Sequence, residues 1–167
     1  MDRAESIHSL NKAVADELQA VHQYMYFHFH LADQGFQPLA MLFKQTAIQE
    51  MGHVELLAER ILFLKGDVEM VAAGPVEKIV EAEQMLVKGM TMEAESATAY
   101  NKAALKCGAK ADSASKQLFE QLVKDEEMHF DQYEKQRDNI HRFGPSYLAL
   151  QSFGGGTSQG GAAPVTG

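Results

Sequence analysis

The sequence predicts an all-α fold, a bundle of four long helices followed by a short fifth helix. Apolar residues recur every three or four positions over four long stretches, a spacing that places them on one face of a helix. Glycine or proline lies between these stretches, where helices end. The chain of 167 residues is long enough for one hydrophobic core and too short for two comfortable domains, so we expect a single bundle domain.

The first two helices are expected over residues 3–33 and 38–65. Nothing interrupts the first periodic stretch before Gly35. Pro38 suits the first turn of the second helix, and Lys65-Gly66 supplies a basic last turn and a glycine stop.

The next two helices are expected over residues 77–107 and 112–141. The third should begin after Gly74-Pro75 and end at Gly108, because both segments break a helical pattern. Asp112 suits the N-cap of the fourth helix, since its carboxylate can accept a hydrogen bond from a free backbone N–H.

Loop lengths indicate how the helices are connected. The breaks at 34–37 and 108–112 are short, which favours antiparallel helix hairpins. The connection at 66–76 has about eleven residues and can span about 36 Å, close to the roughly 45 Å length of a 30-residue helix. We therefore expect one long crossover between helices two and three, which makes these two helices parallel.

The C-terminal end differs from the bundle in composition. Gly144-Pro145 should end the fourth helix, and Ser146 to Ser152 can form the short fifth one. Residues 153–167 are rich in Gly, Ser, Ala and Thr, a composition typical of flexible chain. We expect a bundle domain over 1–152 and a disordered tail over 153–167.

Composition and charge exclude several classes of function. The formal charge of −8, with no cluster among the 15 basic residues, argues against nucleic-acid binding. No apolar run approaches the roughly 18 residues of a membrane span, and the Met-Asp-Arg start does not resemble a signal peptide, so we expect a cytoplasmic protein without membrane partners. The single cysteine, Cys107, excludes an intrachain disulfide and a Cys-x-x-Cys metal site, so any metal must bind through oxygen and nitrogen.

Polar residues interrupt the apolar face near the midpoint of each predicted long helix. Because the midpoints of aligned helices lie at one level, four carboxylates should meet halfway along the bundle. Burying an unpaired carboxylate costs on the order of several kcal/mol, and a cation would neutralise the group. A hydrogen-bonded polar layer without metal is the weaker alternative. The four residues are Glu17, Glu50, Glu93 and Glu126.

Two of these glutamates begin Glu-x-x-His motifs, which end at His53 and His129. Residues three apart on a helix lie about 60° apart in azimuth and roughly 4.5 Å apart along the axis, so both side chains can reach one ion. A third motif, Glu5-x-x-His8, lies off the apolar face and is attributed to chance. Four carboxylates and two imidazoles are too many ligands for one ion and suit two iron or manganese ions bridged by carboxylates, with zinc able to substitute.

Other polar residues on the first helix have two interpretations each. Tyr24 lies two turns from Glu17 on the same face, so it either hydrogen-bonds a metal ligand or is a core tyrosine. His22, His28 and His30 have no carboxylates at matching spacing, so we expect surface or interface roles for them.

The sequence resembles the bacterioferritins over about residues 1 to 150. Four segments carry the resemblance: Asp16–Ala20, Glu50–His53, Glu59–Gly66 and Asp125–His129. It implies a ferroxidase centre that oxidises Fe(II) with O2 or H2O2, and a hollow homo-oligomer of 24 subunits that stores the ferric mineral. A ferredoxin or reductase would assist iron release. The implied iron ligands are Glu17, Glu50, His53, Glu93, Glu126 and His129, with Glu50 and Glu126 bridging.

Met51 matches the methionine that ligates haem b between two subunits in this family. It lies about 100° around the helix from the preceding glutamate, so it points away from the bundle axis. His22 and Lys44 depart from the neutral or apolar residues expected near such a pocket. Gln45 and Gln49 stand where some bacterioferritins carry His and Asp at an auxiliary cavity site.

Three alternatives remain from the sequence. A dodecameric Dps-like mini-ferritin would mainly consume peroxide with Fe(II), although Cys107 lacks the second cysteine that such relatives often carry. A rubrerythrin-like di-iron oxidoreductase usually adds a Cys-x-x-Cys iron domain, which is missing here. A purely structural bundle leaves the mid-helix carboxylates without an explanation.

Overall fold

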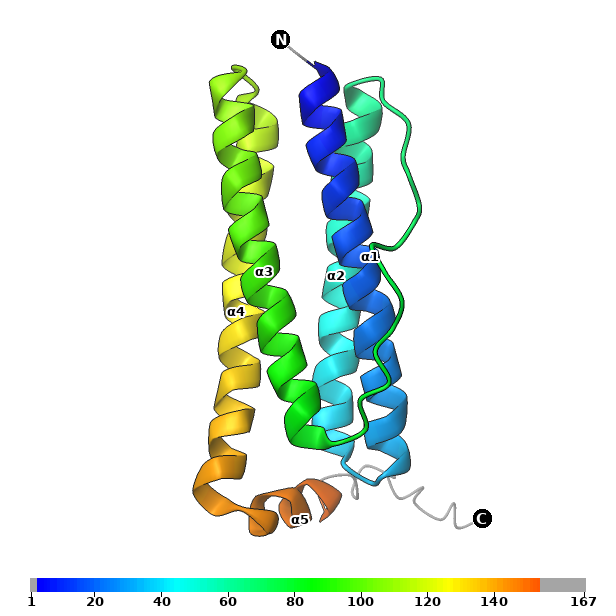
Figure 1. The fold of residues 1–167 in the computed structure, drawn as a ribbon, viewed down its shortest axis with the longest axis vertical. Coiled ribbons are helices and arrows are strands. Elements are labelled where there is room, and N and C mark those ends of the chain that lie inside the picture. Colours follow the sequence, from blue (N-terminus) through cyan, green and yellow to red (C-terminus); the bar gives the residue numbers. More distant parts are fainter. Residues whose placement is uncertain (1–2, 154–167) are drawn as a thin grey trace, which may run out of the picture.

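The computed structural model describes residues 3–153, and it confirms the predicted fold class. Helices α1 and α2 form one antiparallel hairpin, α3 and α4 form a second, and α5 lies across one end of the bundle (Figure 1). Among the described residues no helix is long and apolar enough to span a membrane. The helices are α1 (Arg3–Asp33), α2 (Gln37–Phe63), α3 (Ala82–Ala109), α4 (Ser113–Phe143) and α5 (Pro145–Phe153).

The predicted C-terminal tail falls almost entirely outside the description. Residues 154–167 are not among the described residues. Phe153, the first residue of the predicted tail, is instead the last residue of α5. The short fifth helix is confirmed, one residue longer at each end than expected.

The crossover between α2 and α3 runs along the outside of α1 for most of the bundle's length, which makes α2 and α3 parallel as predicted (Figure 1). Its extent was predicted wrongly, because α3 begins at Ala82 and not near residue 77. The Gln23 side chain accepts from the Glu77 amide at 2.8 Å and donates to the Glu77 carbonyl at 2.9 Å. A backbone segment with both groups satisfied in this way has no need of helical hydrogen bonds.

Two further side-chain amides on α1 hold the crossover in the same manner. Asn11 donates to the Asp67 carbonyl and accepts from the Glu69 amide, both at 2.9 Å. Gln19 donates to the Pro75 carbonyl at 2.8 Å and accepts from the Gly74 amide at 3.0 Å. The extended connection is therefore anchored along its length by α1.

The end of α2 also differs from the prediction. Lys65, not Gly66, adopts the left-handed conformation, with φ of 66°. The Gly66 amide donates to the Ile61 carbonyl at 3.0 Å, as in a Schellman C-cap. Glycine is required at 66 for space, because a Cβ there would lie 2.7 Å from Ile7 Cγ2.

The start of α4 follows the prediction, whereas the end of α3 does not. Gly108 lies inside α3, and Ala111 takes the left-handed conformation with φ of 57°. Asp112 is the N-cap of α4, and its Oδ1 accepts from the Ser115 amide at 3.2 Å. Arg60 on α2 donates to the same oxygen at 2.6 Å and ties the two helix hairpins together.

The apolar core consists of two clusters separated by a polar layer. One cluster contains Leu10, Leu57 and Phe119, and the other contains Phe27 and Phe43. On α2, α3 and α4 the mid-helix polar residues lie in sequence between the contributions to the two clusters, whereas on α1 Glu17 lies beside Leu18, the last α1 residue of the first cluster. The polar layer is thus closed at both ends by apolar side chains.

Candidate metal centre

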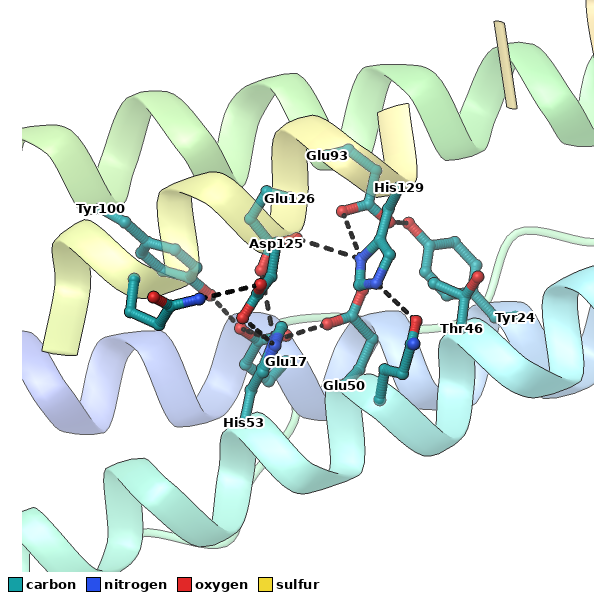
Figure 2. A network of polar contacts seen from close by, with 12 residues as sticks. Glu17, Tyr24, Thr46, Glu50, His53, Glu93, Tyr100, Asp125, Glu126 and His129 are labelled. Carbon is teal, nitrogen blue, oxygen red and sulfur yellow. Dashed lines mark hydrogen bonds and ion pairs between the residues drawn. The ribbon is translucent and has the colours of Figure 1, made fainter. Parts of the chain in front are cut away.

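The four long helices bring all six predicted ligands together in this polar layer (Figure 2). α1 and α3 contribute one glutamate each, while α2 and α4 contribute one glutamate and one histidine each. No member is more than 6% exposed. The six residues are Glu17, Glu50, His53, Glu93, Glu126 and His129.

The six residues form two overlapping groups, each with ligand atoms within 4.8 Å of one another. We call them the His53 half-site and the His129 half-site. The first adds Glu17 and the second adds Glu93, whereas both contain the carboxylates of Glu50 and Glu126. Two adjacent cations bridged by shared carboxylates fit this arrangement.

The inward polar atoms approach one another without forming hydrogen bonds. His53 Nδ1 lies 2.8 Å from Glu50 Oε2 and 3.3 Å from Glu126 Oε1. His129 Nδ1 lies 3.0 Å from Glu50 Oε1. Both Nδ1 atoms, both Glu50 oxygens and Glu126 Oε1 are nevertheless buried without a hydrogen-bond partner. Buried polar atoms without partners are costly, and cations bound between them would remove that cost.

The charges of the metal-free layer are strongly coupled. Burial and the nearby carboxylate of Glu50 raise the pKa of Glu17 well above its usual range, and burial likewise raises the pKa of Glu93. Burial disfavours an imidazolium, yet the carboxylates of Glu126 and Glu50 raise the pKa of His129 to about 12. The ionisation of each carboxylate and imidazole in the layer therefore depends on the charges of the others.

Two buried tyrosines hold the terminal glutamates in a crossed arrangement. Tyr24, on α1 with Glu17, donates its hydroxyl proton to Glu93 Oε1 on α3. Tyr100, on α3 with Glu93, donates to Glu17 Oε1 on α1 at 2.9 Å. The sequence reasoning included Tyr24 and missed Tyr100. A signal was available, because each tyrosine follows the glutamate of its own helix by seven residues.

The outward nitrogens of the two histidines have partners from the opposite hairpin. His53 Nε2 lies 3.3 Å from Asp125 Oδ2, and His129 Nε2 lies 2.8 Å from Gln49 Oε1. Such partners fix the imidazole tautomer, which leaves Nδ1 of each ring to bind a metal. Gln49 and Asp125 were not among the predicted site residues, although each directly precedes a predicted glutamate.

The remaining candidates lie away from this layer. Met51 is 38% exposed on the outside of α2. The His22 side chain is exposed, the His28 Nδ1 atom lies 2.8 Å from the Ala40 carbonyl oxygen, and the His30 ring packs against Tyr26. Within residues 3–153 none of these histidines joins a group able to hold a metal.

Comparisons with known proteins agree with this architecture. A family model described as a ferritin-like domain matches residues 7–143. The bacterioferritin of Desulfovibrio desulfuricans is 36% identical over 150 residues, covering 88% of this chain and 82% of the relative. The bacterioferritin of Rhodobacter capsulatus is 34% identical over 148 residues, covering 88% of this chain and 91% of the relative.

Solved structures of the same two relatives are also similar. The D. desulfuricans bacterioferritin, described with its diiron site in different catalytic states, has a TM-score of 0.88 at 34% identity and covers 96% of both chains. The R. capsulatus bacterioferritin, described with a metal-free dinuclear site and haem iron, has a TM-score of 0.86 at 31% identity and covers 95% of this chain and 98% of its own. This chain therefore belongs to the bacterioferritins, a family of ferritin-like proteins.

Proposed function

We propose that this protein is an iron-storing ferroxidase that oxidises Fe(II) at a two-iron centre within each subunit. The observation that carries the proposal is the sharing of Glu50 and Glu126 between two buried half-sites. A single cation would leave the Nδ1 of one histidine and one terminal glutamate of the layer without a bound metal. The bacterioferritin relatives support the same function.

The donor atoms present fit iron. Each half-site offers one histidine Nδ1, one terminal carboxylate and two shared carboxylates. This mixed oxygen and nitrogen set suits Fe(II) and Mn(II), and zinc can occupy a four-donor site of the same kind. The partnerless Nδ1 and carboxylate atoms are the positions where such ions would bind.

Bound Fe(II) would supply the electrons that reduce O2 or H2O2. The protein's contribution is to hold four carboxylates and two imidazoles close together in one layer of the bundle before iron binds. Tyr24 and Tyr100 keep the terminal carboxylates oriented through their hydrogen bonds. The apolar clusters at either end limit the access of bulk water, which strengthens the electrostatic interactions within the layer.

Rapid-mixing measurements of Fe(II) oxidation test the proposal. Glu50→Ala removes a shared carboxylate and should abolish rapid oxidation while leaving the helical circular-dichroism signal largely intact. Glu55→Ala removes an exposed carboxylate from the same helix and should retain the wild-type rate. His129→Ala provides a second test from the opposite hairpin. Unchanged oxidation kinetics in Glu50→Ala and His129→Ala would refute the site.

We further propose that Met51 ligates haem b at a twofold contact between subunits. Met51 and Ile48 lie exposed on the outside of α2, and apolar side chains in that position suit burial against a second subunit. Haem-supplemented protein should show a Soret band that Met51→Leu weakens and Met41→Leu preserves, Met41 being an equally exposed methionine of the same helix. Normal haem binding by Met51→Leu would exclude this ligand.

The assembly we propose is a hollow shell of 24 subunits that stores ferric mineral. Sedimentation of the purified protein distinguishes this shell from the 12-subunit particle of a Dps-like mini-ferritin. A rubrerythrin-like oxidoreductase would turn over peroxide repeatedly without accumulating mineral. A cytoplasmic location and iron release through a ferredoxin or reductase remain predictions from the family resemblance.

A further inference from the structure

The metal centre has an approximate internal twofold symmetry that exchanges the two helix hairpins. α1 and α3 each contribute one terminal glutamate and one tyrosine, which donates to the terminal glutamate of the opposite hairpin. α2 and α4 each contribute one shared glutamate and one histidine. The exchanged pairs are Glu17 with Glu93, Tyr24 with Tyr100, Glu50 with Glu126, and His53 with His129.

One pair of side chains breaks this symmetry. Asp125, whose Oδ2 lies 3.3 Å from His53 Nε2, is a carboxylate. Gln49, whose Oε1 lies 2.8 Å from His129 Nε2, is a neutral amide. Gln121 donates to Asp125 Oδ1 at 3.1 Å. The other carboxylate oxygen of Asp125 faces His53 (Figure 2). The two histidines therefore have equivalent positions and unequal partners.

We propose that this difference ranks the two half-sites, so that a divalent cation fills the His53 half-site first and the His129 half-site second. A carboxylate behind an imidazole makes the ring a stronger electron donor and adds negative charge close to the ion. An amide oxygen fixes the same tautomer without adding charge. Gln49 and Asp125 are thus positioning residues, and the proposal rests on the two-metal centre of the proposed function.

Ranked half-sites make a specific prediction about stepwise binding. When one half-site is much tighter, the first association constant reports that half-site and the second reports the weaker one. A substitution that affects only the weaker half-site then changes only the second association constant. If the two half-sites were equal, the same change would raise the first association constant, because the first ion would bind preferentially at the improved half-site.

Gln49→Glu tests the weaker half-site with an almost isosteric change, since the oxygen facing His129 is kept and only charge is added. Metal-free protein would be titrated with Co(II), followed by calorimetry and by visible absorption of the bound ion. The second association constant should rise about 10-fold and the first should stay within about twofold. A rise in the first constant, or no change in either, would overturn the ranking.

Asp125→Asn tests the tighter half-site. Its contacts with His53 and Gln121 can both be kept if the Gln121 amide turns over, so the variant removes charge with little change in shape. The first association constant should fall about 10-fold and the second much less. A fall confined to the second constant would contradict the proposal.

Two controls separate local from general charge effects. Gln45→Glu adds the same charge as Gln49→Glu, at an exposed position one turn from Gln49. Glu127→Gln removes an exposed charge two residues after Asp125. Neither should change the two constants by more than about twofold. Two Co(II) ions bound with unranked affinities would refute only this inference. A failure to bind two Co(II) ions would instead refute the proposed two-metal centre.

Discussion

The Tyr100 hydroxyl donates a 2.9 Å hydrogen bond to Glu17 Oε1, which joins α3 to the terminal glutamate of the opposite hairpin. Both residues are almost completely buried. Burial and the nearby charge of Glu17 raise the pKa of Tyr100 well above its usual value, so the hydroxyl remains a donor at neutral pH. The contact therefore fixes the carboxylate on which the His53 half-site depends.

Tyr100→Phe should remove the hydrogen bond that positions the Glu17 carboxylate, while the aromatic ring continues to fill the core. Removing a hydrogen bond that orients a metal ligand typically costs 10- to 100-fold in metal affinity or activity, so we expect Fe(II) oxidation to slow by about 10-fold. Rapid-mixing kinetics would measure the rate, and Co(II) titration would show whether the loss lies in binding. Tyr26→Phe, on the partly exposed side of α1, is the control and should keep the wild-type rate. Equal rates for wild type and Tyr100→Phe would contradict the role given to this contact.

The metal centre could be anticipated from the sequence because its geometry follows from helix midpoints. Glu17, Glu50, Glu93 and Glu126 meet because aligned helices of similar length bring equivalent positions to one level. The late start of α3 could not be anticipated. It depends on Gln23 binding both backbone groups of Glu77, a contact between residues 54 positions apart that leaves no local signal.

The hydrogen-bonding partners around the site could be predicted from the sequence only in part. The seven-residue spacing that relates Tyr24 to Glu17 also relates Tyr100 to Glu93, so an internal repeat was available in the sequence. That each tyrosine bonds the opposite glutamate required the packing of one hairpin against the other. Gln49 was predicted only as a departure from an auxiliary site, and its contact with His129 became visible in the structure.

The buried carboxylates should lower the stability of the metal-free protein relative to a variant that lacks one of them. Burial raises the pKa of Glu93, which indicates that its charged form is costly at this position. Glu93→Gln keeps an oxygen for the Tyr24 hydroxyl and removes the buried charge, so it should raise the unfolding free energy of the metal-free protein by more than the roughly 0.5 kcal/mol typical of a surface substitution. Urea unfolding in the presence of a chelator would measure the change. Glu95→Gln, at an exposed position on the same helix, should have an effect within about 0.5 kcal/mol.

Zinc should reverse this order of stability. A ligand at 100 times its dissociation constant stabilises the folded state by about 2.7 kcal/mol, and wild type should gain at least this amount. Glu93→Gln lacks one terminal ligand and should gain less. A variant that is less stable than wild type without metal, yet keeps the full zinc response, would show that Glu93 has a structural role only.

The ion pair between Asp112 and Arg60 should give the protein a pH-dependent stability term. Burial alone would raise the pKa of Asp112. Hydrogen bonds from Ser115 and Arg60 outweigh this effect and hold the pKa of Asp112 below its usual value of 3.8. A group whose pKa is lower in the folded state than in the unfolded state stabilises the fold at a pH above its unfolded-state pKa. That stabilisation is lost as the pH falls through the folded-state pKa. Asp112→Asn keeps a good N-cap residue and removes only the charge.

At pH 7 we expect Asp112→Asn to lower the unfolding free energy by about 1.5–3 kcal/mol, the range for a hydrogen bond to a charged group. Below pH 3.8 the difference from wild type should shrink, because wild type also loses the charge. Urea unfolding across this pH range would measure it. Glu120→Gln, which removes an exposed ion pair with Lys116, should change stability by less than about 1 kcal/mol. A difference independent of pH would exclude the charge as its origin.

Gly89 lies where α3 approaches the ring of Tyr133, and substitution there should disturb both stability and the metal centre. A Cβ at position 89 would lie 2.8 Å from Tyr133 Cδ2. The ring has little room to move, because it stacks on Phe43 with centroids 4.8 Å apart and meets Tyr24 edge-on at 5.6 Å. Overpacking of this kind costs about 1–3 kcal/mol, more than the roughly 1 kcal/mol that alanine gains over glycine inside a helix.

Gly89→Ala should therefore be destabilised overall, and any shift of Tyr133 toward Tyr24 should also slow Fe(II) oxidation by moving the hydroxyl that holds Glu93. Gly108→Ala, on the same helix, is the matched control. A Cβ there would lie 3.2 Å from Lys116 Cδ, the movable end of a partly exposed side chain, so the helix preference for alanine should prevail and stability should rise by up to about 1 kcal/mol. Opposite signs for the two substitutions would locate the strain at the Tyr133 ring, whereas equal gains would mean that the aromatic cluster can yield without affecting the site.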